Sequence, residues 1–166
     1  MEEKENIDIK NLYTEQDLNM MRLADEAMQA GKSRVDEIKA YAKKAGIKRI
    51  GIANCMAVQK EADRLKDMLS GDFEVYSASC KIDGIPRSVF IGETARGIAC
   101  NPAGQALYLD RNGTELNISF GLCMGHDIIF NGKSKAPVTT LVVKDRKYRH
   151  NPFQHFSEVP SEKEKD

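Results

Sequence analysis

Four short runs of apolar and β-branched residues constrain the fold of this chain most. Segments of helical periodicity separate the first three runs, and the short segment GLCMGHDIIFNGKSKAP joins the last two. The runs are Ile47–Asn54, Phe73–Ser79, Leu116–Phe120 and Val138–Val143. A helical segment between consecutive strands makes a crossover, and a crossover requires the two strands to run parallel. The alternation therefore predicts an α/β fold, a three-layer Rossmann-like sandwich with a mostly parallel sheet of about four strands.

Two further helices are expected before the first strand. Thr14 with Asp17, and Ser33 with Asp36, have the spacing of N-terminal capping pairs, and each pair precedes apolar residues at helical intervals. Gly46 stands where a left-handed C-cap would end the second helix. The fold expected is thus the sandwich plus two N-terminal helices.

The length of 166 residues suits one compact domain, which we expect over residues 11–156. The segments Met1–Lys10 and Ser157–Asp166 are charged or polar, so both are expected to be disordered. Between the second and third strands, Lys81–Ala99 carries several Gly and Pro residues and has no clear period. Irregular loops of this length are often functional in small domains.

The charge balance argues against several classes of partner. There are 25 Lys and Arg residues against 25 Asp and Glu, and a net charge of zero gives no excess field for a nucleic-acid backbone or an anionic membrane surface. No stretch approaches the roughly 20 apolar residues of a membrane span, and the N-terminus lacks the pattern of a secretory signal. We therefore expect a cytoplasmic protein, in which four cysteines are thiols, metal ligands or catalysts rather than disulfides.

Cysteines follow the strands of the predicted sheet. Cys55 comes directly after the first strand, Cys80 directly after the second, and Cys123 three residues after Phe120. The carboxyl ends of parallel strands share one edge of the sheet, where ligands bind in folds of this class. If the long loop stays at that edge, Cys100 at its end joins the other three.

Four thiolates suit an iron–sulfur cluster, which we prefer, or zinc. No CxxC pair occurs, so the interpretation rests on the coincidence of cysteines with strand ends and not on their spacing. The plainer alternative is that these cysteines are small apolar residues that pack well beside buried strands.

The segment Gly121–Asp127 (GLCMGHD) favours a second chemistry. Its G-x-C-x-G pattern after a strand resembles a nucleophile elbow, in which glycines allow a tight turn that exposes the central side chain. A helix N-terminus there would favour the Cys123 thiolate. His126, or His150 after the fourth strand, would serve as the base, and backbone N–H groups of the turn would stabilise an oxyanion.

These alternatives stay open at the level of residues. His126 and His150 are candidate additional metal ligands or orienting donors, and Asp83, Asp127 and Asp145 are candidate carboxylates near strand ends. A third interpretation is a binding module whose cysteines only pack. The chain has no G-x-G-x-x-G and no G-K-[ST], which argues against dinucleotide and P-loop sites.

Six motifs occur in order along roughly Leu12–Phe156: IKRIGIANC from Ile47, CNP with QA from Cys100, GLCMGHD from Gly121, APVTTL from Ala136, KDR from Lys144 and HNP from His150. Together they resemble the domain of unknown function 1847 family, prokaryotic proteins usually labelled only as metal-binding. The resemblance implies a metal or cluster held by Cys55, Cys80, Cys100 and Cys123. Members typically begin with an additional cysteine-rich stretch, whereas this chain has MEEKENIDIK there.

The function expected from the sequence is a metal-binding protein with a redox or sulfur-related role, and the metal-free cysteine enzyme is the alternative. Whether the protein is an enzyme stays open. A small-molecule or redox partner is expected, with no nucleic acid and no membrane. A homodimer is compatible with a sheet that has two edges to protect.

Overall fold

A computed structural model describes residues 9–28 and 30–157 of the chain. The disorder predicted for residues 1–8 and 158–166 lies outside these described residues. Lys10 and Ser157 were also predicted to be disordered, but both are helical. Lys10 belongs to a short 3-10 helix, η1 (Ile9–Leu12), and Ser157 is the last residue of the helix α7. The chain divides into two compact units, residues 1–47 and 48–166. The single domain expected over residues 11–156 stays a prediction.

The first unit contains two helices, α1 (Glu15–Ala27) and α2 (Arg34–Lys44). Both begin with a complete capping box. The Thr14 and Ser33 hydroxyls accept bonds from the backbone N–H groups of Asp17 and Asp36, and these carboxylates accept bonds in return. The two helices that the sequence predicted are therefore present.

The second unit contains the predicted sheet. Its strands are β1 (Arg49–Asn54), β2 (Glu74–Ser79), β3 (Leu116–Phe120) and β4 (Val138–Val142). The order is β2-β1-β3-β4, and all three pairings are parallel. The expected α/β sandwich is confirmed.

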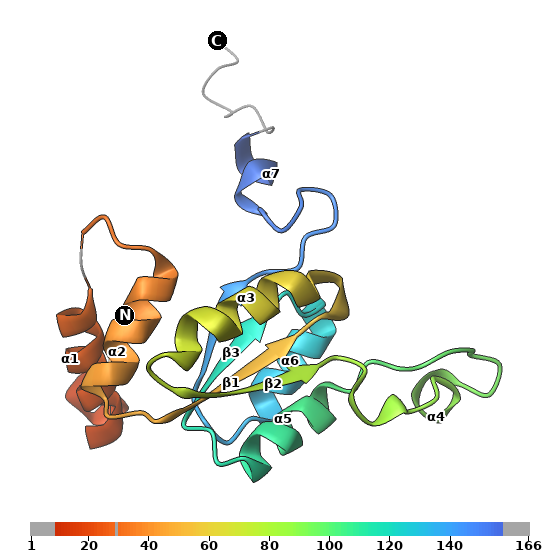
Figure 1. The fold of residues 1–166 in the computed structure, drawn as a ribbon, viewed down its shortest axis with the longest axis horizontal. Helices are drawn as coiled ribbons and strands as arrows, with labels where there is room; N and C mark the ends of the chain where they lie inside the picture. The colour runs from red at the N-terminus through yellow and green to blue at the C-terminus, as the bar shows by residue number, and fades with distance from the viewer. Residues whose placement is uncertain (1–8, 29, 158–166) are drawn as a thin grey trace, which may run out of the picture. The chain divides into compact units, whose positions relative to one another are not determined.

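Helices cover both faces of this sheet (Figure 1). α3 lies on one face, and α5 and α6 lie on the other, as right-handed crossovers require for this strand order. The bounds of these and the smaller helices are η2 (Met56–Val58), α3 (Gln59–Ser70), η3 (Ile82–Gly84), α4 (Ser88–Ile91), α5 (Pro102–Arg111), α6 (Met124–Lys133) and α7 (Phe153–Ser157).

The two central strands form the core. Ile50 and Ile52 of β1 and Ile118 of β3 are fully buried, and Phe130 of α6 is the largest side chain without solvent exposure. Burial of such side chains provides most of the driving force for folding. An added Cβ at Gly51 would lie 2.1 Å from Asn117 Oδ1, so the core is tightly packed around β1.

The strand order reverses next to β1. The chain leaves β1 for the edge strand β2 and then returns to β3 on the other side of β1. Ligands of doubly wound sheets bind at such a reversal, outside the carboxyl ends of the strands. Cys55 and Cys123 follow the two strands that flank it. None of the helices in the described part of the chain is long and apolar enough to cross a membrane.

Candidate functional site

Backbone hydrogen bonds bring Cys55, Cys80 and Cys100 together at the carboxyl edge of the sheet. The Cys55 N–H donates to Phe120 O over 3.1 Å, and the Cys80 N–H donates to Asn54 O over 2.9 Å. Both bonds extend the parallel ladders one residue past the strands. The Asn101 N–H donates to Cys80 O over 2.8 Å, which places Cys100 beside Cys80 although the two are separated by the whole loop.

The three thiols also interact. Burial raises the pKa of the Cys80 thiol from its usual value to about 11. The neighbouring Cys100 and Cys55 thiols act in the same direction, and a bond from the Met56 N–H, 3.4 Å from Cys80 Sγ, opposes them. The Cys80 sulfur is therefore a neutral thiol at neutral pH and needs a cation to ionise there.

The donor set has the chemistry of a soft-metal site, but its present arrangement is not that of a single ion. Thiolates select zinc and iron–sulfur clusters. No group of three or more His, Cys, Asp or Glu side chains within residues 9–28 and 30–157 is arranged to hold a metal ion. The thiols would therefore have to turn toward a common centre before three sulfurs could contact one metal.

Cys123 lies at the predicted elbow. Gly121 adopts a left-handed conformation (φ +66°), and Cys123 is the N-cap of α6, with no side-chain bond to the first turn of that helix. Arg146 Nη2 lies 3.2 Å from Cys123 Sγ. A guanidinium and a helix N-terminus both stabilise negative charge on sulfur. Cys123 is not among the groups that act on the Cys80 thiol.

Two basic residues after β4 contact the site cysteines, and the sequence predictions gave them no role. Lys144 Nζ lies 3.5 Å from Cys55 Sγ, and Arg146 contacts Cys123. Both follow β4 at the same edge as the cysteines. The argument that placed the cysteines, the position of a residue after a parallel strand, was therefore also available for Lys144 and Arg146.

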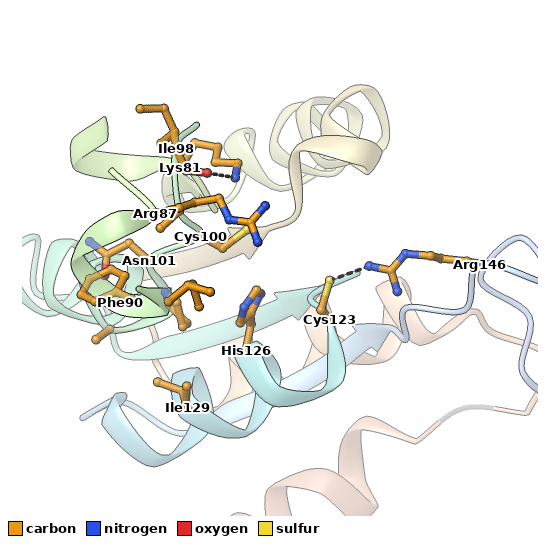
Figure 2. Close-up of a pocket in the computed structure, with 14 residues that line it drawn as sticks. Lys81, Arg87, Phe90, Ile98, Cys100, Asn101, Cys123, His126, Ile129 and Arg146 are labelled. Carbon is orange, nitrogen blue, oxygen red and sulfur yellow. Dashed lines mark hydrogen bonds between the residues drawn. The ribbon is translucent and has the colours of Figure 1, made fainter. Parts of the chain in front are cut away.

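A cavity of about 650 Å³ opens between the N-terminal ends of α5 and α6 (Figure 2). Cys100 and Asn101, directly before α5, line it on one side, and Cys123, the N-cap of α6, and His126 in the first turn of α6 line it on the other. Arg146 closes one side of it. The cavity thus connects Cys100, one of the three interacting thiols, with Cys123 at the elbow.

The structure separates the two candidate histidines. The His126 side chain projects from the first turn of α6 into the cavity (Figure 2). His150 is not among the described residues that line the cavity, and its Nδ1 accepts a bond from the Asp145 N–H over 3.3 Å. His126 is therefore the histidine that can act on a ligand of this cavity.

The candidate carboxylates are used within the fold. Asp127 accepts a short hydrogen bond from the buried Ser119 hydroxyl, which fixes α6 to β3. Asp83 accepts from Asn101 Nδ2 over 3.0 Å, and Asp145 accepts from the Tyr148 N–H over 2.8 Å. None of the three lines the cavity among the described residues.

Comparison with known proteins places the chain in a family. Residues 1–141 match the family described as "Protein of unknown function (DUF1847)". A relative named "Uncharacterized protein MJ0455", from the archaeon Methanocaldococcus jannaschii, is 48% identical over 124 residues. The match covers 72% of this chain and 64% of the relative, so the chain spans less than two thirds of the archaeal protein. No solved structure matches. The chain belongs to the DUF1847 family.

Proposed function

We propose that the protein binds a metal centre, an iron–sulfur cluster in preference to zinc, through Cys55, Cys80 and Cys100. The observation that carries this proposal is the interaction of three thiols at one edge of the sheet, contributed by three distant parts of the chain. Two of these cysteines are buried, and Cys100 reaches the cavity. Cys123, across the cavity, is the candidate fourth ligand.

The surroundings of the sulfurs favour a cluster. Cys55 Sγ accepts from Lys144, Cys80 Sγ from the Met56 N–H, and Cys123 Sγ from Arg146. Hydrogen bonds to sulfur are one means by which proteins tune iron–sulfur centres, and cations balance the negative charge of a thiolate-ligated cluster. A cluster is also larger than one ion, so its ligands need not meet at a single point.

The test is metal and sulfide analysis with an absorption spectrum on the full chain purified without oxygen. Iron, sulfide and a broad band at about 400 nm would support a cluster. Stoichiometric zinc without colour would support the same ligands with the other metal. Cys55→Ser, Cys80→Ser and Cys100→Ser should each lose the metal, and Ser79→Ala, a small change beside Cys80, should keep it.

Two outcomes would contradict the metal proposal. If neither iron with sulfide nor zinc remains bound after anaerobic reconstitution and desalting, the metal proposal is wrong. Retention of metal by all three serine variants would also contradict it. The Cys123→Ser variant adds a separate answer, because loss of metal there assigns the fourth ligand and retention leaves that position to another group.

The surroundings of Cys123 favour one second candidate, a metal-free cysteine enzyme. Cys123 would be the nucleophile, with its thiolate stabilised by Arg146 and the α6 N-terminus, and His126 would be the base. A cytoplasmic location would suit either candidate, because both need reduced thiols.

Alkylation kinetics test this second candidate. In metal-free protein at neutral pH, Cys123 should react with iodoacetamide faster than the other three cysteines, and Arg146→Gln should slow it several-fold by removing the neighbouring cation. Arg96→Gln, which removes a charge elsewhere, is the control. Equal rates at Cys123 in the wild type and Arg146→Gln would argue against an activated nucleophile.

A further inference from the structure

The cavity beside the cysteines has a charged and an apolar part. Arg87, Arg146 and Lys81 line it, and none of the described residues that line it is Asp or Glu. The apolar wall of the cavity is formed by Phe90, Ile91, Ile98 and Ile129. A cavity of about 650 Å³ is within the usual range for small-molecule sites, which combine apolar walls with a few polar groups.

The three basic residues are not equivalent. Lys81 Nζ donates to the Ile98 carbonyl, so it holds the loop closed. Arg146 donates to Cys123 Sγ. Within the described part of the chain, the Arg87 guanidinium has no hydrogen-bond or ion-pair partner. A ligand group held by Arg87 would therefore not displace an existing bond.

Backbone hydrogen bonds fix the position of Arg87 in the loop. The Arg87 N–H donates to Gly97 O over 2.8 Å, and the Ala99 N–H donates to Ile85 O over 2.7 Å. These bonds fold the loop back on itself as a short antiparallel pair between Pro86 and Ile98. Figure 2 shows Arg87 and Arg146 entering from opposite sides, with His126 below the end of the Arg87 side chain and Cys123 next to the Arg146 guanidinium.

We propose that this cavity binds a small organic anion with an apolar body, whose carboxylate or phosphate group lies between Arg87 and Arg146. Guanidinium groups are the side chains best suited to bind such groups through paired hydrogen bonds. The apolar part of the ligand lies against Phe90, Ile98 and Ile129. The proposal concerns the same cavity as the metal centre, and it can be tested on metal-free protein because no cysteine is needed to hold the anion.

The test is titration of metal-free full-length protein with hexanoate, its neutral counterpart hexanamide, and hexyl phosphate, followed by amide NMR signals and calorimetry. Hexanoate or hexyl phosphate should shift signals of residues 98–103 and 123–129 and bind at least about tenfold more tightly than hexanamide. Whichever anion binds more tightly identifies the head group.

Two arginine variants decide the assignment. Arg87→Gln should weaken binding of the preferred anion by about tenfold or more, whereas Arg96→Gln, in the same loop but outside the cavity, should leave it unchanged. Equal affinity for hexanoate and hexanamide, equal effects of the two variants, or no binding of either anion at millimolar concentration would overturn the proposal. Since the protein in this test carries no metal, failure here leaves the metal proposal to its own test.

Discussion

At the scale of single residues, the four cysteines have different surroundings. Cys55 and Cys80 are buried, and Cys100 and Cys123 are half-buried. Cys80 lies beside two other thiols, whereas Cys123 lies beside a guanidinium. The sequence predicted which edge of the sheet these residues occupy. It also predicted that Cys100 joins the other cysteines if Lys81–Ala99 stays at that edge. It did not predict the contact of Arg146 with Cys123, because a position after a strand gives the edge of the sheet but not which side chains meet there.

The Cys80 thiol makes the stability of the metal-free protein depend on pH. Its pKa in the fold, about 11, lies above the usual value of a thiol, so the folded state binds the proton more tightly than the unfolded state. The stabilisation is complete below the usual thiol pKa and is lost as pH rises toward 11. The free energy of unfolding of the metal-free protein, measured by urea denaturation, should therefore decline between pH 8 and pH 11.

The variant Cys80→Ser supplies the comparison, because a serine hydroxyl does not ionise in this range. Its unfolding free energy should decline less steeply with pH than that of the wild type. The same slope in both proteins would show that Cys80 does not keep its proton in the fold.

At the scale of elements, strands were easier to predict than α6. The four strands lie within one or two residues of their expected bounds, since short buried strands have a strong apolar signal. The segment that forms α6 was expected only as a short connection with a helical turn at Cys123. Gly125, Asn131 and Gly132 weaken its helical propensity, and the burial of Phe130 in the tertiary fold compensates for that.

Close packing around β1 gives a prediction for Gly51. An added Cβ would lie 2.1 Å from Asn117 Oδ1 and 2.8 Å from Leu109 Cδ1. Gly51→Ala should therefore destabilise the fold by about 1–3 kcal/mol or more, measured as a lower midpoint of urea unfolding.

Gly132→Ala is the matched control for that experiment. A Cβ at Gly132 meets nothing within 4 Å, and alanine is a better helix former than glycine, so this variant should be unchanged or up to about 1 kcal/mol more stable. Equal destabilisation in both variants would show that the contact at Gly51 is not the cause.

At the scale of the whole molecule, all four strands and all four cysteines belong to the unit of residues 48–166. This unit has its own core, built around β1 and β3. Composition and length predict one domain over residues 11–156. A length of this order does not, however, reveal how contacts are distributed along the chain.

A truncated chain tests the independence of the larger unit. Residues 48–166 alone should fold cooperatively, since the sheet and the helices on both its faces are complete within them. Dispersed amide NMR signals and a sigmoidal urea transition would show this. An unfolded fragment beside a folded full chain would show that residues 1–47 are required, and would favour the single domain.

The basic side chains that contact Cys55 and Cys123 come from one stretch of three residues, Lys144 to Arg146, directly after the edge strand β4. The two thiols lie on opposite sides of the strand-order reversal, and the positive charges beside them come from the same short stretch of chain. A shift of that stretch would change the charge beside both sulfurs in one movement, although the two cysteines are 68 positions apart in the sequence.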